Sequence, residues 1–377
     1  MIYLDNAATT GEKPVEVKRA VLFALNNLSA NPGRGGHKQS LSASEAVYGV
    51  RDKLSLFFGA GGPENVAFTA NCTHALNFVI KGILKRGDHT VVSDLEHNAV
   101  TRPLKSVTDN ISVAEVSFSD DEKTADNFEK AIRDDTKLVI CTAASNVTGK
   151  ILPLKKIGAI CRKKGVPFLV DGAQGGGVIP INMKEMYIDY LCLAPHKGFY
   201  APMSTGVLIT EKTIAKTVIE GGNGADSLSL VQRPDMPGGF ESGTVSLPNI
   251  YGIGAGIDYV NRVGRENIYR HELSLTNYLY GKLKQLDGVL LYAPKPENGV
   301  FAPVLSFNIS GMDSEQTADI LNRHNIAVRA GFHCSKFAHE KLKTTDSGTV
   351  RVSPAVFNKK GEIDYLIEII KKYEKNR

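Results

Sequence analysis

Two residues that can do chemistry follow two short apolar segments in the middle of the chain. Asp171 comes after Phe168-Leu169-Val170, and Lys197 comes shortly after Tyr190-Leu191-Cys192-Leu193. Both apolar segments predict short buried strands. In an open parallel sheet, ligands bind outside the carboxyl ends of the strands. An acid and a lysine at two such ends are therefore expected to face one ligand.

This combination suits the chemistry of pyridoxal phosphate. A lysine that loses its proton can form an imine with an aldehyde. A carboxylate can keep a pyridine nitrogen protonated, so that the ring accepts electrons from a carbanion. Taken singly, Asp171 is more easily explained as a strand-end acid, and Lys197 as a surface lysine. The assignment therefore depends on the residues around them.

A series of short motifs along the chain supplies that support. The motifs are Tyr3-Leu4-Asp5-Asn6-Ala7-Ala8-Thr9-Thr10, Arg34-Gly35-Gly36-His37, Glu96-His97, Ser145-Asn146-Val147-Thr148-Gly149, Asp171-Gly172-Ala173-Gln174, His196-Lys197, Gly243-Thr244, Arg329-Ala330-Gly331-Phe332-His333-Cys334 and Arg351-Val352-Ser353. In this order they resemble the class V aminotransferase superfamily of fold-type I pyridoxal phosphate enzymes. Within it, the chain is most similar to the cysteine desulfurase and selenocysteine lyase branch. Each motif is weak alone, but the ordered set covers nearly the whole chain and is specific.

The resemblance implies a cofactor site built around Lys197. This lysine would bond to the cofactor and later act as the base at the substrate Cα. Asp171 would hold the ring nitrogen, and His97 would stack on the ring. Asn146 and Gln174 match side chains near the phenolic oxygen of the pyridine. The ordinary alternatives are a helix-capping role for the histidine and a turn role for the two amides.

The resemblance also implies where the cofactor phosphate binds. Cys72 and Thr73 match the phosphate-binding turn before a helix, whose N-terminus offers N–H groups and a positive dipole end to an anion. Asn71 or Thr73 can at the same time cap that helix. His196 matches a residue beside the phosphate. The family usually has Ser or Thr and then Gly before the His-Lys pair, whereas this chain has Ala194-Pro195, which removes a donor worth about 1–3 kcal/mol.

Two further matches imply a homodimer with a shared active site. Gly243 and Thr244 match a loop that reaches the phosphate of the neighbouring subunit. Arg34 matches a residue contributed across the same interface, and a solvated loop charge is the alternative for it.

The remaining matches concern the substrate and the sulfur. Arg351 matches the arginine that binds the substrate α-carboxylate, which its planar fork suits, and Arg329 matches a second arginine, for which a structural ion pair is the alternative. Cys334 is a loop cysteine between His333 and Ser335-Lys336, a setting in which a thiol can be reactive. Desulfurases use such a thiolate to take sulfur from cysteine, which leaves a persulfide and releases alanine. A chance loop thiol is the alternative, and the family usually has Ala-Pro or similar after this cysteine.

Composition, charge and cysteine spacing exclude several classes of protein. The 377 residues are 42% hydrophobic with a net charge of +5, which is ordinary for a globular chain and too mild to indicate nucleic-acid binding. We find no apolar run near the ~20 residues of a membrane span and no signal-peptide pattern, so we expect a cytoplasmic protein. Five cysteines without a C-x-x-C pair indicate no disulfide framework and no metal site. The sequence predicts that Cys141, Cys161 and Cys192 are buried.

The elements that position these residues alternate between strand and helix. This pattern predicts an α/β fold, with a large domain containing a mostly parallel, doubly wound sheet and a smaller C-terminal α+β domain. We assign residues 13–258 to the large domain, and residues 1–12 and 259–377 to the small one. The segment 221–248 predicts a long functional loop. The expected elements include strands at 66–69, 90–93, 111–118, 137–144, 168–170, 190–193, 289–292, 304–309 and 327–329, and helices at 41–58, 73–84, 125–133, 154–164, 250–278, 315–323 and 360–372.

The sequence therefore predicts a homodimeric, pyridoxal-phosphate-dependent cysteine desulfurase that delivers sulfur to an acceptor protein. Selenocysteine lyase is the nearest alternative, because selenium leaves more readily than sulfur. Another lyase or transaminase of the class V aminotransferase type is a further one. A non-catalytic scaffold for a sulfur carrier is disfavoured, since it needs none of Asp171, Lys197 and Arg351.

Overall fold

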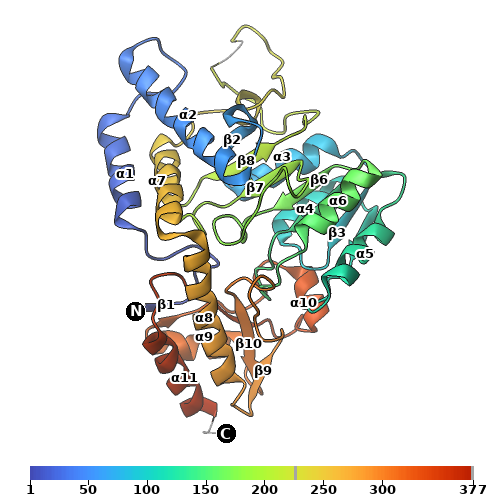
Figure 1. The fold of residues 1–377 in the computed structure, drawn as a ribbon, viewed down its shortest axis with the longest axis vertical. Coiled ribbons are helices and arrows are strands. Elements are labelled where there is room, and N and C mark those ends of the chain that lie inside the picture. The colour runs from blue at the N-terminus through green and yellow to red at the C-terminus, as the bar shows by residue number, and fades with distance from the viewer. Residues whose placement is uncertain (225–226, 375–377) are drawn as a thin grey trace.

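A central β-sheet organises the larger part of the molecule. The computed structural model describes residues 1–224 and 227–374 (Figure 1). The strands of the central sheet are β2 (Val66–Thr69), β3 (His89–Ser93), β4 (Ile111–Ala114), β5 (Thr136–Thr142), β6 (Phe168–Asp171), β7 (Tyr190–Leu193) and β8 (Gly206–Thr210). Their order is β2-β8-β7-β6-β5-β3-β4. β8 is antiparallel to both neighbours, whereas β3 to β7 run parallel, so the carboxyl ends of β6 and β7 lie at one edge.

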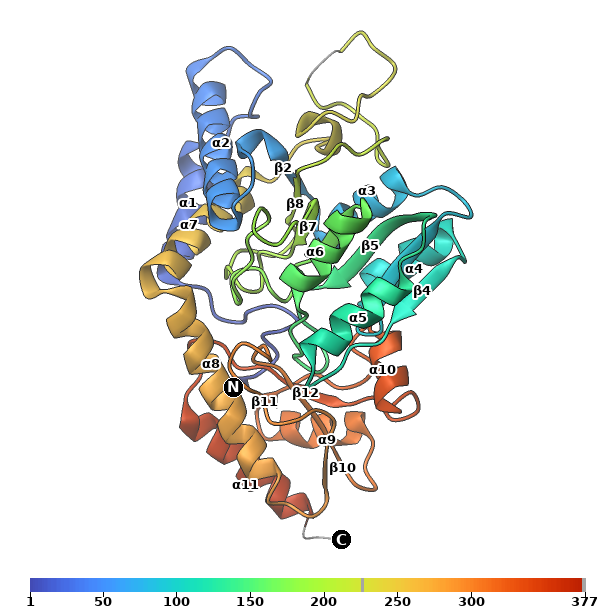
Figure 2. The ribbon, with the colours of Figure 1, turned by 45° about the vertical axis from the view of Figure 1, so that its right-hand side comes forward.

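Helices cover both faces of this sheet. They are α1 (Val15–Asn27), α2 (Lys38–Phe58), α3 (Cys72–Ile83), α4 (Asn98–Val107), α5 (Asp121–Ala131), α6 (Leu154–Lys164) and α7 (Leu247–Val263). α3 and α4 pack on one face, through strand residues such as Leu169 and Leu208. α2, α5, α6 and α7 pack on the other, through the alternate residues such as Phe168 and Val170. Figure 2 shows α5 and α6 lying side by side over the sheet. This arrangement is the predicted doubly wound α/β fold.

The C-terminal part forms a second, smaller core. Its elements are α8 (Arg265–Leu283), β9 (Val289–Leu291), β10 (Leu305–Ile309), α9 (Ser314–Arg323), β11 (Ile326–Ala327), α10 (Lys336–Leu342), β12 (Val350–Val352) and α11 (Lys360–Glu374). β10 pairs with β9 and β12 in antiparallel fashion. The N-terminal strand β1 (Ile2–Tyr3) pairs with β11, and Leu4 joins this core. Both chain termini therefore lie at the same end of the molecule (Figure 1).

The predicted single helix over 250–278 is wrong. The structure has α7 and α8 in its place, separated by Gly264, whose φ is +87°. A glycine adopts this left-handed backbone easily, and the chain changes direction there. The predicted domain boundary at residue 258 stays a prediction, and it falls within α7.

Several other predictions match the structure, and some elements were missed. The strands at 66–69 and 190–193 and the helix at 154–164 have the predicted ends, whereas the strand at 111–118 stops at Ala114. The sequence analysis identified neither β8 nor α10. The cysteines at 141, 161 and 192 are buried, as predicted. Among residues 1–224 and 227–374, no helix combines the length and the apolar character that crossing a membrane requires.

Candidate active site

Asp171 and Lys197 come from neighbouring strands, as predicted. Asp171 ends β6 and pairs in register with Cys192 of β7, and the lysine follows four residues after β7. Asp171 is 3% exposed, and its Oδ1 accepts a hydrogen bond from the Ala173 N–H at 2.9 Å. Burial raises the pKa of Asp171, and the lysine charge opposes that rise. Burial also lowers the pKa of Lys197 to about 8, although Asp171 opposes it.

The predicted phosphate-binding turn lies at the start of α3. Asn71 is the N-cap, because its Oδ1 accepts a hydrogen bond from the His74 N–H at 3.0 Å. This leaves the N–H groups of Cys72 and Thr73 at the helix N-terminus for an anion. The Cys72 thiol donates to Asp171 Oδ1 at 3.7 Å, and burial holds its pKa well above the usual range. This thiol therefore stays protonated. It lies beside Asp171, the carboxylate that is predicted to hold the ring nitrogen of the cofactor.

His196 adds an unpaired polar atom to the predicted phosphate site. Its Nδ1 is buried and has no hydrogen-bond partner within the described residues. Its backbone carbonyl accepts hydrogen bonds from the Thr10 N–H at 3.1 Å and from Lys13 Nζ at 3.2 Å. Burial, with help from the charges of Lys197 and Lys13, lowers the pKa of His196 to about 4. The imidazole is therefore neutral and can donate one N–H to an anion.

His97 lies at the N-terminus of α4 and is also neutral. Its Nδ1 accepts a hydrogen bond from the Ala99 N–H at 3.0 Å, so the ring proton is on Nε2. Burial, and next the charge of Lys197, lowers the pKa of His97 to about 4. The ordinary alternative, a capping histidine, is therefore correct, because the ring nitrogen Nδ1 makes the cap. The charge of Lys197 acts on the same ring.

Arg351 occupies the centre of the predicted substrate side. Its side chain is 1% exposed, with Nη2 donating to Asp5 Oδ1 at 2.6 Å and Nη1 donating to the Asn146 carbonyl at 3.2 Å. Its Nε has no partner among the described residues. Arg329 bridges to Arg351 through the backbone, and its Nη2 lies 3.8 Å from Cys334 Sγ. The structural ion pair that was the alternative for Arg329 is thus formed by Arg351, with Asp5.

The Cys334 loop is held against this group. Cys334 is exposed, and its carbonyl accepts a hydrogen bond from the Asn98 N–H at 2.6 Å. Asn146 Nδ2 donates to the His333 carbonyl at 2.7 Å. The predicted nucleophile therefore lies beside the start of α4, next to the residue that follows His97.

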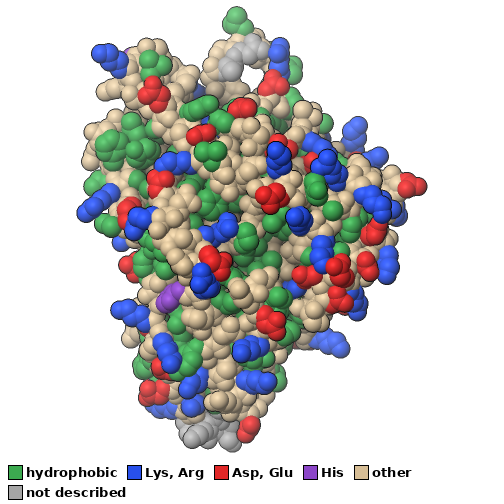
Figure 3. Space-filling view, viewed as in Figure 1, with side chains coloured by type: hydrophobic (Ala, Val, Ile, Leu, Met, Phe, Trp, Pro, Cys, Tyr) green, Lys and Arg blue, Asp and Glu red, His purple; other side chains and the backbone are tan. Residues whose placement is uncertain are grey.

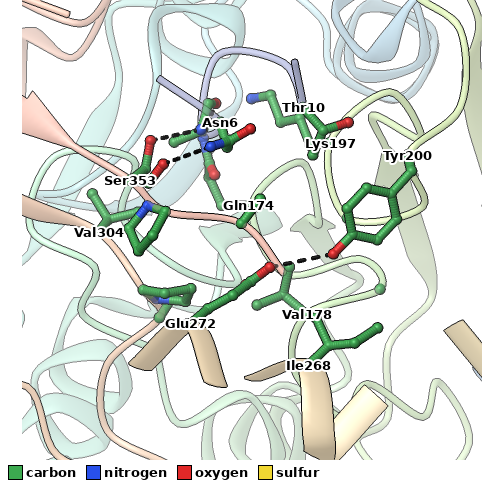
Figure 4. A pocket seen from close by; sticks show the side chains of 17 residues that line it. Asn6, Thr10, Gln174, Val178, Lys197, Tyr200, Ile268, Glu272, Val304 and Ser353 are labelled. Atoms are coloured by element: carbon green, nitrogen blue, oxygen red, sulfur yellow. Dashed lines mark hydrogen bonds between the residues drawn. The ribbon is translucent and has the colours of Figure 1, made fainter. Parts of the chain in front are cut away.

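Gln174, which the sequence predicts to bind the cofactor, lines a cavity together with Lys197 (Figure 4). Gln174 Nε2 donates to the Ala7 carbonyl at 2.9 Å. At the other side of the cavity, the Tyr200 hydroxyl donates to Glu272 Oε1 at 3.2 Å, and burial raises the pKa of Glu272 to about 8. Sequence reasoning missed Glu272, because one acid within a long helical pattern gives no local signal.

Sequence reasoning also missed a second buried acid, Glu96, although it precedes His97 in one of the motifs. It is 0% exposed, and its Oε1 accepts a hydrogen bond from the Thr142 N–H at 2.8 Å and another from the Ser93 hydroxyl. Burial raises its pKa to about 8. It therefore joins the ends of β3 and β5, next to His97 in the chain.

Arg34, Gly243 and Thr244 form a separate group. Arg34 is exposed, and its Nη2 donates to the carbonyls of Gly222 and Gly243 at 2.6 and 2.7 Å. Thr244 lines a different cavity together with Thr69 and His74, which flank the predicted phosphate-binding turn in the sequence. None of the three lines the cavity at Lys197. Their role across a dimer interface stays a prediction.

The residues that are present fit pyridoxal phosphate. A lysine with a lowered pKa can bond to an aldehyde, and the Asp171 carboxyl group is buried near it. A helix N-terminus and an unpaired buried nitrogen of His196 are available for a phosphate. These are the groups that the cofactor needs at its aldehyde, its ring nitrogen and its phosphate.

Comparisons with known proteins agree with this geometry. A family model described as "Aminotransferase class-V" matches residues 2–366. A protein of Synechocystis sp. named "Probable cysteine desulfurase" is 30% identical over 380 residues, which cover 98% of this chain and 90% of that protein. Another of the same name, from Methanothermobacter thermautotrophicus, is 32% identical and covers 98% of this chain and 94% of its own length. The apo structure of a cysteine desulfurase from Thermococcus onnurineus has a TM-score of 0.89 at 31% identity, covering 100% of this chain and 95% of that one.

Proposed function

Because the chain belongs to the class V aminotransferase family, we propose that it is a pyridoxal-phosphate-dependent cysteine desulfurase. It would convert L-cysteine to L-alanine and take the sulfur onto Cys334 as a persulfide. The observation that carries this proposal is the exposed Cys334 thiol, which lies 3.8 Å from Arg329 Nη2 in a loop whose backbone is held by Asn98 and Asn146. A transaminase needs no such thiol at this place.

When bound, pyridoxal phosphate supplies an aldehyde that bonds to amines and a ring that accepts electrons. Because the pKa of Lys197 is lowered to about 8, a useful share of its amine is unprotonated near neutral pH. The same amine can then remove a proton from the substrate Cα. Asp171 would hold a proton at the ring nitrogen, and the turn at Cys72 and Thr73, together with His196, would hold the phosphate.

The substrate side is divided between two arginines and a neutral histidine. Arg351 and Arg329 would hold the α-carboxylate, with the unpaired Nε of Arg351 as a free donor. His97 would lie on the face of the ring and present its Nε2 proton. Because the pKa of His97 is lowered to about 4, it would act as a neutral hydrogen-bond donor and not as an imidazolium.

The sulfur step balances without an external oxidant. The Cys334 thiolate would form a bond to the substrate Sγ while the Cβ–Sγ bond breaks. The electron pair of the broken bond stays with Cβ, which takes up a proton, so that alanine leaves and the persulfide remains.

The proposal includes a homodimer, in which Arg34, Gly243 and Thr244 complete the site of the neighbouring subunit. It also includes transfer of the sulfur to an acceptor protein.

Mass spectrometry of the peptide that contains Cys334 tests this function. The purified protein is incubated with pyridoxal phosphate and L-cysteine, without reductant, and then digested. We expect one added sulfur on Cys334. The Lys197→Ala variant, with its thiol intact, is expected to show none, and Cys334→Ala is expected to release no alanine under the same single-turnover conditions.

Two results would contradict the proposal. One is a protein that stays colourless when pyridoxal phosphate is added. The other is a coloured protein that gains no sulfur on Cys334 from L-cysteine, while the peptide itself is detected.

A further inference from the structure

The Cys334 loop has a backbone that needs support. His333 and Cys334 both have positive φ angles, +47° and +56°. For a residue with a Cβ, this left-handed backbone conformation costs about 1–2 kcal/mol. Such a turn persists only where surrounding contacts hold it, so the contacts of this loop decide where the thiol lies.

The side-chain amide of Asn146 holds the loop from both sides of the thiol. Its Nδ2 donates to the His333 carbonyl at 2.7 Å, and its Oδ1 accepts a hydrogen bond from the Ser335 hydroxyl at 2.7 Å. All three residues are buried, with Ser335 at 0% exposure and Asn146 at 6%. One amide thus fixes the residue before Cys334 and the residue after it.

The serine hydroxyl also fixes which way the amide faces. An amide oxygen accepts, and an amide nitrogen donates two hydrogens. With the oxygen on Ser335 and one N–H on His333, the second N–H of Asn146 remains for another acceptor. If Ser335 lost its hydroxyl, the buried oxygen would have no donor, and a rotated amide would turn its oxygen toward the His333 carbonyl and repel it.

We propose that Ser335 is a positioning residue for sulfur transfer, acting through Asn146 to fix the Cys334 thiol beside the cofactor site. The proposal rests on the proposed function for its activity readout. The same amide extends by its backbone carbonyl to Arg351 Nη1 at 3.2 Å. The loop, the amide and the substrate arginine are therefore one hydrogen-bonded unit, in which the Ser335 hydroxyl donates to the Asn146 amide oxygen.

Three serine variants test this role. Ser335→Ala removes the hydroxyl, and Ser335→Thr retains it. Ser347→Ala is the matched control, because it makes the same chemical change in the same segment but its hydroxyl donates to the Gly348 carbonyl and not to Asn146. We expect Ser335→Ala to lower kcat about tenfold, the size of one neutral hydrogen bond, with KM for L-cysteine unchanged within about twofold. Ser335→Thr should recover most of kcat, and Ser347→Ala should match the wild type.

Hydrogen exchange in the cofactor-free protein gives a readout that does not depend on activity. The N–H groups of Asn98 and Ser335 bond to Cys334 and Phe332 within this unit. We expect peptides that contain them to exchange faster in Ser335→Ala only, with the melting temperature recording global folding. Unchanged exchange in Ser335→Ala, or a raised KM with kcat retained, would overturn the positioning role. Failure of the wild type to form a persulfide would instead overturn the proposed function.

Discussion

Two buried carboxyl groups stand out among single residues because their pKa values lie above neutrality. Glu96 and Glu272 are nearly or fully buried, and burial raises the pKa of each to about 8. In the unfolded chain both would ionise near pH 4.3. The native protein therefore binds more protons than the unfolded chain between about pH 4.5 and 8. These groups contribute stability that is fully present below this window and is lost as the pH rises through it.

Glu272→Gln tests this sign. Gln keeps an oxygen that accepts the Tyr200 hydroxyl but has no charge to bury. We expect equal stability of variant and wild type near pH 4, and a gain of about 4 kcal/mol for the variant at pH 8. Urea denaturation at both pH values measures it. The exposed acid Glu45 provides the control, since Glu45→Gln should change neither value. A variant that is less stable at both pH values would contradict the prediction.

The ion pair of Asp5 and Arg351 leads to a second prediction at this scale. Arg351 is 1% exposed, so loss of its carboxylate partner leaves a buried charge unpaired. We expect Asp5→Ala to lower the free energy of unfolding by about 2–4 kcal/mol, because Asp5 itself is partly exposed. The exposed pair Lys336–Glu340 is the comparison, and Glu340→Ala should cost about 0.5 kcal/mol or less. Urea denaturation measures both losses. Equal losses of unfolding free energy in the two variants would contradict the prediction that the buried pair contributes more to stability.

At the scale of elements, the sequence predicted helices well where their ends carry chemical signals. The helix over 154–164 has apolar residues at Leu154, Ile157 and Cys161, three basic residues in its last turn and Gly165 as a left-handed cap. The single helix over 250–278 was wrong because an apolar periodic pattern continues through Gly264, and a glycine within a pattern only weakly predicts a break. β8 was missed although Val207-Leu208-Ile209 is a short apolar run of the kind that predicted β6 and β7.

The break at Gly264 gives a prediction for this scale. Its φ of +87° is unfavourable for any residue with a Cβ, and the added atom would lie 2.9 Å from Asn267 Nδ2. We expect Gly264→Ala to lower stability by about 1–3 kcal/mol. Gly281 lies within α8, the helix that begins after Gly264, with helical backbone and open space around it. Gly281→Ala should therefore stabilise the protein by about 0.5 kcal/mol, and thermal melting of both variants checks the opposite signs.

The whole molecule brings together residues that no local pattern could connect. The motifs predicted that Asp171, Lys197, Arg351 and Cys334 belong to one site, because a family resemblance orders them along the chain. The hydrogen bond between Ser335 and Asn146 joins residues 189 positions apart, and the cavity between Lys197 and Glu272 depends on how α8 meets the sheet. Such contacts follow from packing, so the sequence alone could not predict them.

The outer surface of the larger part bears on assembly. α1 exposes Leu22, Phe23 and Leu25, with about half of each side chain accessible, and Figure 3 shows hydrophobic side chains gathered over this helix. Contiguous apolar surface of this kind often marks an interface. Arg34 and Gly243 lie apart from the Lys197 cavity, in a cavity of their own. A dimer that places this second group at the partner's site would account for both observations.

A hybrid dimer decides whether the active site is shared. Lys197→Ala and Arg34→Glu chains are co-expressed with different tags, and only dimers that carry both tags are purified. Each parent homodimer should be nearly inactive. In the hybrid, the chain with Arg34→Glu keeps its lysine and meets an intact Arg34 from its partner, so one of the two sites is complete. We expect about half of the wild-type alanine formation per dimer.

If each chain built its own site, both sites of the hybrid would carry a damaging change and no activity would return. Bound cofactor colour in the Arg34→Glu homodimer shows that this chain folds, and sedimentation of the wild type as a monomer would by itself exclude the shared site.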